Sequence, residues 1–125
     1  MTLACHCRGC QRMSGSAFSL TAMVPESGFA VIAGDPIIGG IHGEEGRHHH
    51  CDWCKSWIFT TLTPSLGFVN VRATQLDEVA WFTPFAETQT AEKLAWVGLP
   101  VRYSFDRWPE PHQFPALLAE YAATA

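Results

Sequence analysis

The sequence has few charged residues and no cluster of basic ones. Eight Lys and Arg stand against 12 Asp and Glu, which gives a formal net charge of −4 over 125 residues. A protein that binds nucleic acid through its phosphates needs several cations on one surface, because each cation neutralises a phosphate. The composition therefore argues against nucleic acid as a partner.

Long apolar runs are also missing. No stretch approaches the ~20 apolar residues that a helix needs to cross a bilayer, and the opening residues 1–4 are too short for a signal peptide. We therefore expect a cytoplasmic protein without a membrane partner. The apolar fraction of 47% is typical of a globular chain, and the length predicts a single domain over residues 1–125.

Short apolar segments separated by glycine and proline make up most of the chain. Strands are predicted where apolar, aromatic and β-branched residues gather, namely at 17–24, 29–33, 37–41, 57–62, 67–73 and 79–83. A short helical turn is predicted from Cys10 to Gly15, one or two turns at 91–97, and a C-terminal helix at 115–123. This pattern predicts a mainly-β fold with minor helices.

Five cysteines fall into two motifs, with C-x-C-x-x-C at Cys5, Cys7 and Cys10 and C-x-x-C at Cys51 and Cys54. In a reducing compartment such clusters indicate metal ligands or catalytic thiols before disulfides, although any single cysteine also suits a packed core. Thiolates at C-x-x-C spacing converge on one ion and suit tetrahedral zinc. A C-x-C-x-x-C loop supplies three thiolates and leaves a fourth position open, as expected of a catalytic zinc.

The histidines near the cysteines are less specific. His48 and His50 point to one face of an extended segment and are candidate zinc ligands. A solvated polar turn beside the second motif is the simpler interpretation of this histidine run. His6 is expected to orient the thiolates from outside the ligand shell, and His42 to be an ordinary surface residue.

The first motif and its surroundings resemble a known family. The segment from Cys5 to Phe18 is similar to the signature of the glutathione-dependent formaldehyde-activating enzyme family, which includes the centromere protein V group. The later features follow in the family's order: the second cysteine motif, residues 69–73 and 76–77, Pro84 and Trp96. The resemblance covers roughly residues 4–100. It implies a β-tent fold of short antiparallel strands with bound zinc.

The resemblance also implies an activity. The family's namesake reaction joins formaldehyde to glutathione as S-hydroxymethylglutathione and is classed with the carbon–sulfur lyases. By matching positions, Cys5, Cys7 and Cys10 would hold the catalytic zinc. Cys51 and Cys54 would supply half of a structural zinc site.

This sequence departs from the family's pattern at several positions. The family usually has a further C-x-C well before the first motif, and this sequence begins too late to include it. We therefore expect the second zinc to use His48, His50 or a residue of another subunit, to be missing, or to merge with the first motif in one Cys-rich site. The family often has glycine where Lys55 stands and histidine where Glu87 stands.

Three functions are consistent with these observations. The first is a zinc-dependent carbon–sulfur lyase that binds a glutathione adduct, with Arg8, Arg12 and Lys55 paired to the carboxylates of glutathione. The second is a non-catalytic zinc domain with a closed four-ligand site, which binds a protein or small-molecule partner. The third is a redox dithiol protein that uses the second motif. A missing edge strand would expose a pairing edge, which predicts a homodimer.

Overall fold

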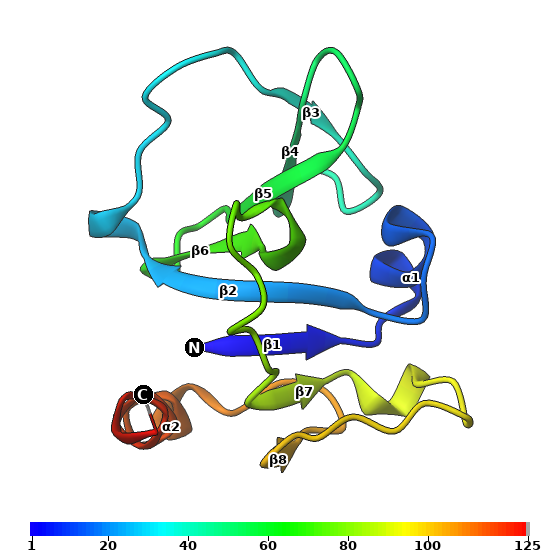
Figure 1. Cartoon of the computed structure of the whole chain (residues 1–125), viewed down its shortest axis with the longest axis vertical. Helices are drawn as coiled ribbons and strands as arrows, with labels where there is room; N and C mark the ends of the chain where they lie inside the picture. The colour runs from blue at the N-terminus through cyan, green and yellow to red at the C-terminus, as the bar shows by residue number, and fades with distance from the viewer. Residues whose placement is uncertain (125) are drawn as a thin grey trace.

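The computed structural model describes residues 1–124 and is built around one eight-stranded sheet (Figure 1). The strands are β1 (Thr2–Cys5), β2 (Ser19–Pro25), β3 (Ile37–Gly39), β4 (Gly46–His50), β5 (Trp57–Leu62), β6 (Phe68–Arg72), β7 (Ala86–Thr88) and β8 (Tyr103–Ser104). They lie in the order β3-β4-β5-β6-β2-β1-β7-β8. The mainly-β expectation is confirmed. The strands from β3 to β1 pair antiparallel, whereas β7 and β8 extend the sheet in parallel.

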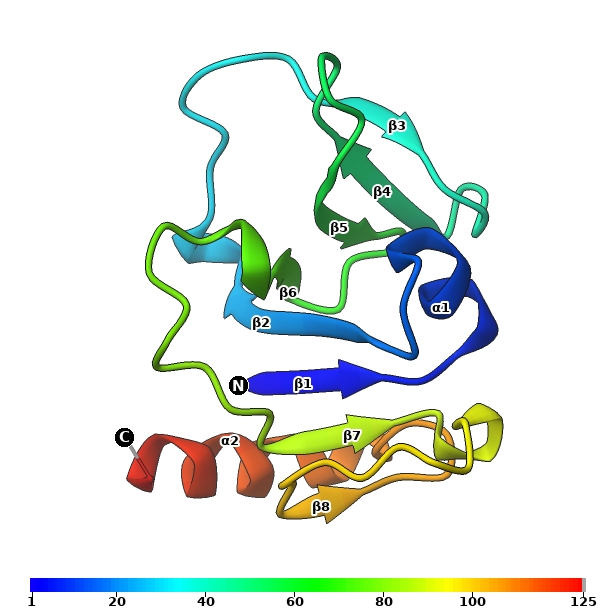
Figure 2. The ribbon, with the colours of Figure 1, turned by 45° about the vertical axis from the view of Figure 1, so that its right-hand side comes forward.

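The two α-helices lie near opposite sides of β1. Helix α1 (Arg8–Ser14) follows the end of β1, and α2 (Phe114–Ala123) lies on the β7–β8 side of the molecule (Figure 2). Leu117 of α2 packs into the core with Leu3, Met23 and Phe85, so the predicted C-terminal helix covers the face of the sheet that carries Leu3 and Met23. Short 3-10 turns occur at 26–28, 73–75, 90–92 and 111–113. Neither helix in the part of the chain that the structure describes is long and apolar enough to span a bilayer.

No strand forms at 29–33, so that prediction is wrong. The predicted strand at 79–83 is wrong as well. The backbone turns there, with the Phe82 amide bonded to the Val79 carbonyl, and the Trp81 side chain is exposed. The strand occurs a few residues later as β7, between β1 and β8. Its buried central residue is Glu87, and a charged residue at that position hides the strand from an apolar pattern. The predicted turns at 91–97 reduce to one 3-10 turn at 90–92.

The histidine run forms strand β4, and the expected solvated turn is wrong. His48 lies opposite Thr60 of β5, and its Nδ1 is 2.7 Å from the Thr60 hydroxyl. Its Nε2 is 2.7 Å from Nδ1 of His42, which is therefore more than an isolated surface residue. The Trp57 indole donates to the same hydroxyl at 2.8 Å. Burial lowers the pKa of His48 to about 4, helped by the nearby positive charge of Arg72.

Because His48 is neutral in the folded protein, acid should destabilise the fold. The pKa of an unfolded histidine is about 6.5, so between that pH and about 4 the unfolded chain binds a proton that the folded chain does not. We expect the free energy of unfolding to decrease as the pH is lowered from about 6.5 to about 4. This decrease should be smaller in His48→Gln. Urea denaturation at several pH values measures it. The exposed His112→Gln is the matched control, and an unchanged pH slope in His48→Gln would contradict the assignment.

Candidate metal centre and adjacent cleft

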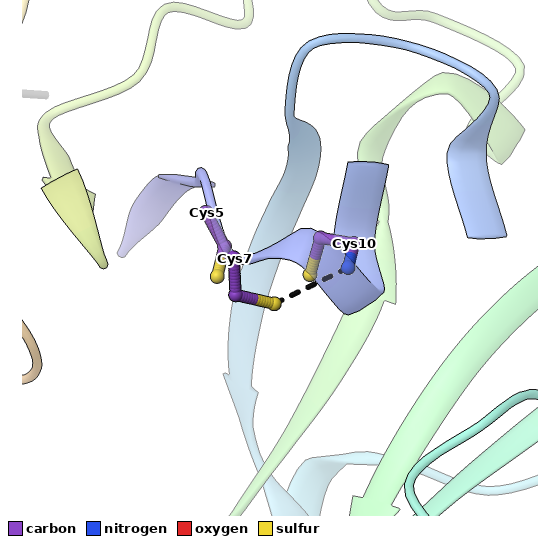
Figure 3. A group of neighbouring side chains, drawn as sticks. All are labelled: Cys5, Cys7 and Cys10. Atoms are coloured by element: carbon purple, nitrogen blue, oxygen red, sulfur yellow. Dashed lines mark hydrogen bonds between the residues drawn. The ribbon is translucent and has the colours of Figure 1, made fainter. Parts of the chain in front are cut away.

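The first cysteine motif spans the junction between β1 and α1. Cys5 ends the strand, Cys7 is the N-cap of the helix, and Cys10 lies in the first helical turn. The Cys7 sulfur accepts a hydrogen bond from the Cys10 amide at 3.2 Å, as Figure 3 shows. Gly15 ends the helix in the left-handed conformation (φ 61°), as the sequence predicted. This short path brings the three sulfurs within 4.8 Å of one another.

The three sulfurs share protons unequally. Hydrogen bonds from Cys10 and Cys5 lower the pKa of Cys7 to about 2. The pKa of Cys10 is raised by its hydrogen bonds with Cys5 and Cys7 and by burial. The pKa of Cys5 is also raised, because its hydrogen bond with Cys7 and burial outweigh the opposite effect of Cys10. One thiolate and two thiols are therefore stable side by side, and three thiolates need a cation between them.

This donor set fits zinc. Tetrahedral zinc with Zn–S bonds of about 2.3 Å places its sulfur ligands roughly 3.8 Å apart, and the three sulfurs already lie within 4.8 Å. Thiolates select zinc and other soft ions over magnesium or calcium. Three protein ligands leave one tetrahedral position for a fourth ligand from outside the group.

The second motif does not join this group. Cys51 and Cys54 lie in the turn between β4 and β5, where the Lys55 amide bonds to the Cys51 carbonyl at 2.8 Å. Within residues 1–124, Cys5, Cys7 and Cys10 are the only set of three or more candidate ligands gathered this closely. The structure therefore does not gather both motifs into the single Cys-rich site that was one of the three alternatives. A structural zinc at Cys51 and Cys54 stays a prediction.

The two candidate histidine ligands are engaged elsewhere. Both ring nitrogens of His48 contact side chains of the sheet and its neighbouring loop. Nδ1 of His50 lies 2.9 Å from the His48 carbonyl, at a bulge in β4. Neither histidine completes a ligand group with the second motif in the described part of the chain.

His6 bonds to a carboxylate on the neighbouring strand instead of to a cysteine sulfur. Its Nε2 donates to Oε2 of Glu87 at 2.7 Å, and the imidazole is fully buried. Burial raises the pKa of Glu87, but hydrogen bonds from Ser104, His6 and Lys93 outweigh it and lower the pKa overall. The ionised Glu87 therefore holds the segment between Cys5 and Cys7 against β7.

A cleft of about 390 Å³ opens beside Trp57. Its lining comes from the end of α1, residues 16 and 18–20, and residues 55–57, 72 and 74–75. Trp57 belongs to both features, because it packs against Cys5 and Cys10 and also lines the cleft. No cysteine is among the residues that line the cleft, so Trp57 is the contact between the cleft lining and the thiols.

Arg72 is a cation at the base of this cleft that the sequence did not single out. It is 7% exposed, and its guanidinium lies 3.9 Å from the centre of the Trp57 ring. Nη2 donates to the Thr21 hydroxyl at 2.5 Å. Burial lowers the pKa of Arg72 to about 10, with the cysteines acting in the opposite direction, so the side chain stays charged at neutral pH. The only sequence signal was an arginine at the end of an apolar strand.

The three basic residues predicted from the sequence to bind substrate are not equally placed. Lys55 lines the cleft and forms an ion pair with Asp52 at 3.0 Å. Arg8 is exposed and bonds to the Gln11 side chain, and Arg12 is exposed outside the cleft lining. The structure brings Lys55 to the cleft and leaves the other two as untested predictions.

The comparison with known families agrees with this geometry. A family model described as glutathione-dependent formaldehyde-activating enzyme matches residues 1–92. The chain belongs to this family. The match spans β1 to β7 and both cysteine motifs, so the resemblance found in the sequence is confirmed. A comparison with curated protein sequences gives no match. The family and the cysteine group together fit a glutathione-related zinc domain.

Zinc binding at the first motif should release protons. Cys7 is already ionised, so the protons come from Cys5 and Cys10. The measurement is titration calorimetry of the metal-free protein in two buffers of different ionisation enthalpy. It uses the Cys51→Ser/Cys54→Ser variant to isolate one site. The added change Cys10→Ser should reduce both zinc affinity and proton release, and full affinity in that variant would contradict the assignment.

Proposed function

We propose that this protein is a zinc-dependent carbon–sulfur lyase that acts on adducts of glutathione with aldehydes, S-hydroxymethylglutathione among them. The observation that carries the proposal is the group of three cysteine sulfurs within 4.8 Å of one another beside a cleft. Membership of the glutathione-dependent formaldehyde-activating family supports the choice of substrate. Cys5, Cys7 and Cys10 are the proposed metal ligands.

The chain's own residues would bind and orient the adduct. Bound zinc would keep the substrate sulfur in its thiolate form and in a fixed position. In the forward direction a carbon–sulfur bond forms between this sulfur and the carbonyl carbon, and the thiol proton ends on the new hydroxyl. The reverse reaction breaks that bond and releases the aldehyde. Trp57 forms a buried wall beside the sulfurs, and excluding water there strengthens the interaction of nearby charges with the reacting atoms.

Lys55 is the predicted substrate-binding residue with the strongest structural support. It holds a left-handed backbone (φ 61°), a conformation that glycine adopts freely and other residues adopt at a cost. The family often has glycine at this position, and the backbone angle explains that preference. A lysine kept in a strained position, with its side chain on the cleft, suggests a role for that side chain.

We also propose that the protein is cytoplasmic and forms a homodimer. All five cysteines are free in the structure, and their use as metal ligands suits the reducing cytoplasm. The sheet ends at β3, where Ile37 and Ile38 are exposed. This edge supports the predicted homodimer, because an unpaired strand is a template for a second copy.

The direct test is catalysis of adduct exchange. Carbon-13 exchange spectroscopy on formaldehyde and glutathione measures how fast S-hydroxymethylglutathione forms and breaks down. Zinc-loaded protein should raise this rate above the spontaneous one. Cys10→Ser should return the rate to the spontaneous value, and His112→Gln, at an exposed position outside the cleft lining, should keep the acceleration. Zinc-loaded protein that binds glutathione without acceleration would instead support the non-catalytic domain.

A further inference from the structure

Strand register places the cysteines and Arg72 on one face of the sheet. Cys5 of β1 lies opposite Ser19 of β2, and Thr21, two residues along β2, lies opposite Arg72 of β6. Directly opposed residues share a face, as do residues two apart on one strand. With strands about 4.8 Å apart and about 3.4 Å per residue, the Cα atoms of Cys5 and Arg72 are roughly 12 Å apart. The long arginine side chain bridges part of that distance.

This face also carries buried polar atoms without a hydrogen-bond partner in residues 1–124. They are Ser19 Oγ, Asn70 Oδ1, Arg72 Nε and Thr88 Oγ1. Asn70 and Thr88 line a separate small cavity of about 10 Å³, which has room for a single bridging water. Arg72 and Ser19 line the large cleft instead. Arg72 therefore combines a place in the cleft lining with a buried Nε that has no partner in the described residues.

Arg72 has the properties of an anion-binding residue. A buried guanidinium is costly unless its charge and its donors are both satisfied. The Trp57 ring and the Thr21 hydroxyl satisfy part of this need, and Nε remains free. A carboxylate meets both demands at once, because its two oxygens match two guanidinium N–H groups.

We propose that Arg72 anchors a carboxylate in the cleft, so that the protein selects thiols that carry a carboxylate several bonds from sulfur. Lys55 also lines this cleft and adds a second positive charge there. The claim that the ligand is a thiol rests on the proposed function. The claim that Arg72 binds a carboxylate of the ligand rests only on the cleft and on the unsatisfied guanidinium.

The ligand side is tested on the wild-type protein, with and without zinc. S-methylglutathione has no thiol, so its binding reports the carboxylate contact separately from the metal. We expect calorimetry to show that it binds about 10-fold or more tightly than its dimethyl ester, since the ester lacks the charged acceptors. Equal binding of acid and ester would overturn the proposal. Inorganic phosphate that competes as well as S-methylglutathione would overturn the choice of carboxylate.

The protein side is tested with matched variants. Arg72→Lys keeps the charge and loses the planar pair of donors, and should weaken S-methylglutathione binding about 10-fold. Arg47→Lys, at an exposed position on β4, should leave it unchanged. Thermal denaturation and circular dichroism confirm that each variant folds. A folded Arg72→Lys protein that binds normally would overturn the proposal.

Lys55→Gly separates binding from stability. Glycine removes the backbone strain at φ 61°, so this variant should unfold at a higher temperature and yet bind S-methylglutathione more weakly. Unchanged binding of S-methylglutathione would show that Lys55 does not contribute to ligand binding. If binding depends on Arg72 but S-hydroxymethylglutathione is not turned over, the proposed lyase activity is refuted and the carboxylate contact of Arg72 stands. If the protein turns over S-hydroxymethylglutathione but binds S-methylglutathione and its dimethyl ester equally, the carboxylate contact of Arg72 is refuted and the lyase activity stands.

Discussion

The junction between β1 and α1 is the constraint on which the site depends. Cys7 caps the helix through its sulfur, and the same sulfur belongs to the thiol group. The segment is fixed on both sides, because β1 pairs with β2 and β7 while His6 bonds to Glu87. The geometry that favours zinc is therefore set by strand pairing and helix capping, and the metal need not fold the loop alone.

Charge links this junction to the cleft. Zinc held by three thiolates carries a net negative charge, and the buried Arg72 is the cation packed behind Trp57 on the same face. The buried guanidinium partly offsets that charge and keeps donors free for a ligand. The cleft lining thus contains two cations, Arg72 and Lys55, and its Trp57 packs against the thiols Cys5 and Cys10. This arrangement suits a molecule with a thiol at one end and a carboxylate further along.

The sequence predicted the features that arise from short-range spacing. The thiol group lies within a few residues of chain, and α2 is rich in helix formers, so local patterns sufficed for both. Features that depend on distant pairing were missed. The burial of His48 requires Thr60 and Trp57 on the next strand. The role of Arg72 requires its register with Thr21. Strand β7 was hidden because its central Glu87 is charged and acquires partners only in the fold.

The central claim is that the first motif holds zinc with three sulfurs and one open position. Zinc-edge X-ray absorption on the Cys51→Ser/Cys54→Ser variant tests it most directly, because only the first motif can then supply cysteine thiolates. We predict one zinc per chain with three sulfur ligands and one lighter atom, and a fourth sulfur when glutathione is added. Fewer than three sulfurs from the protein, or no change in the spectrum with glutathione, would contradict the account.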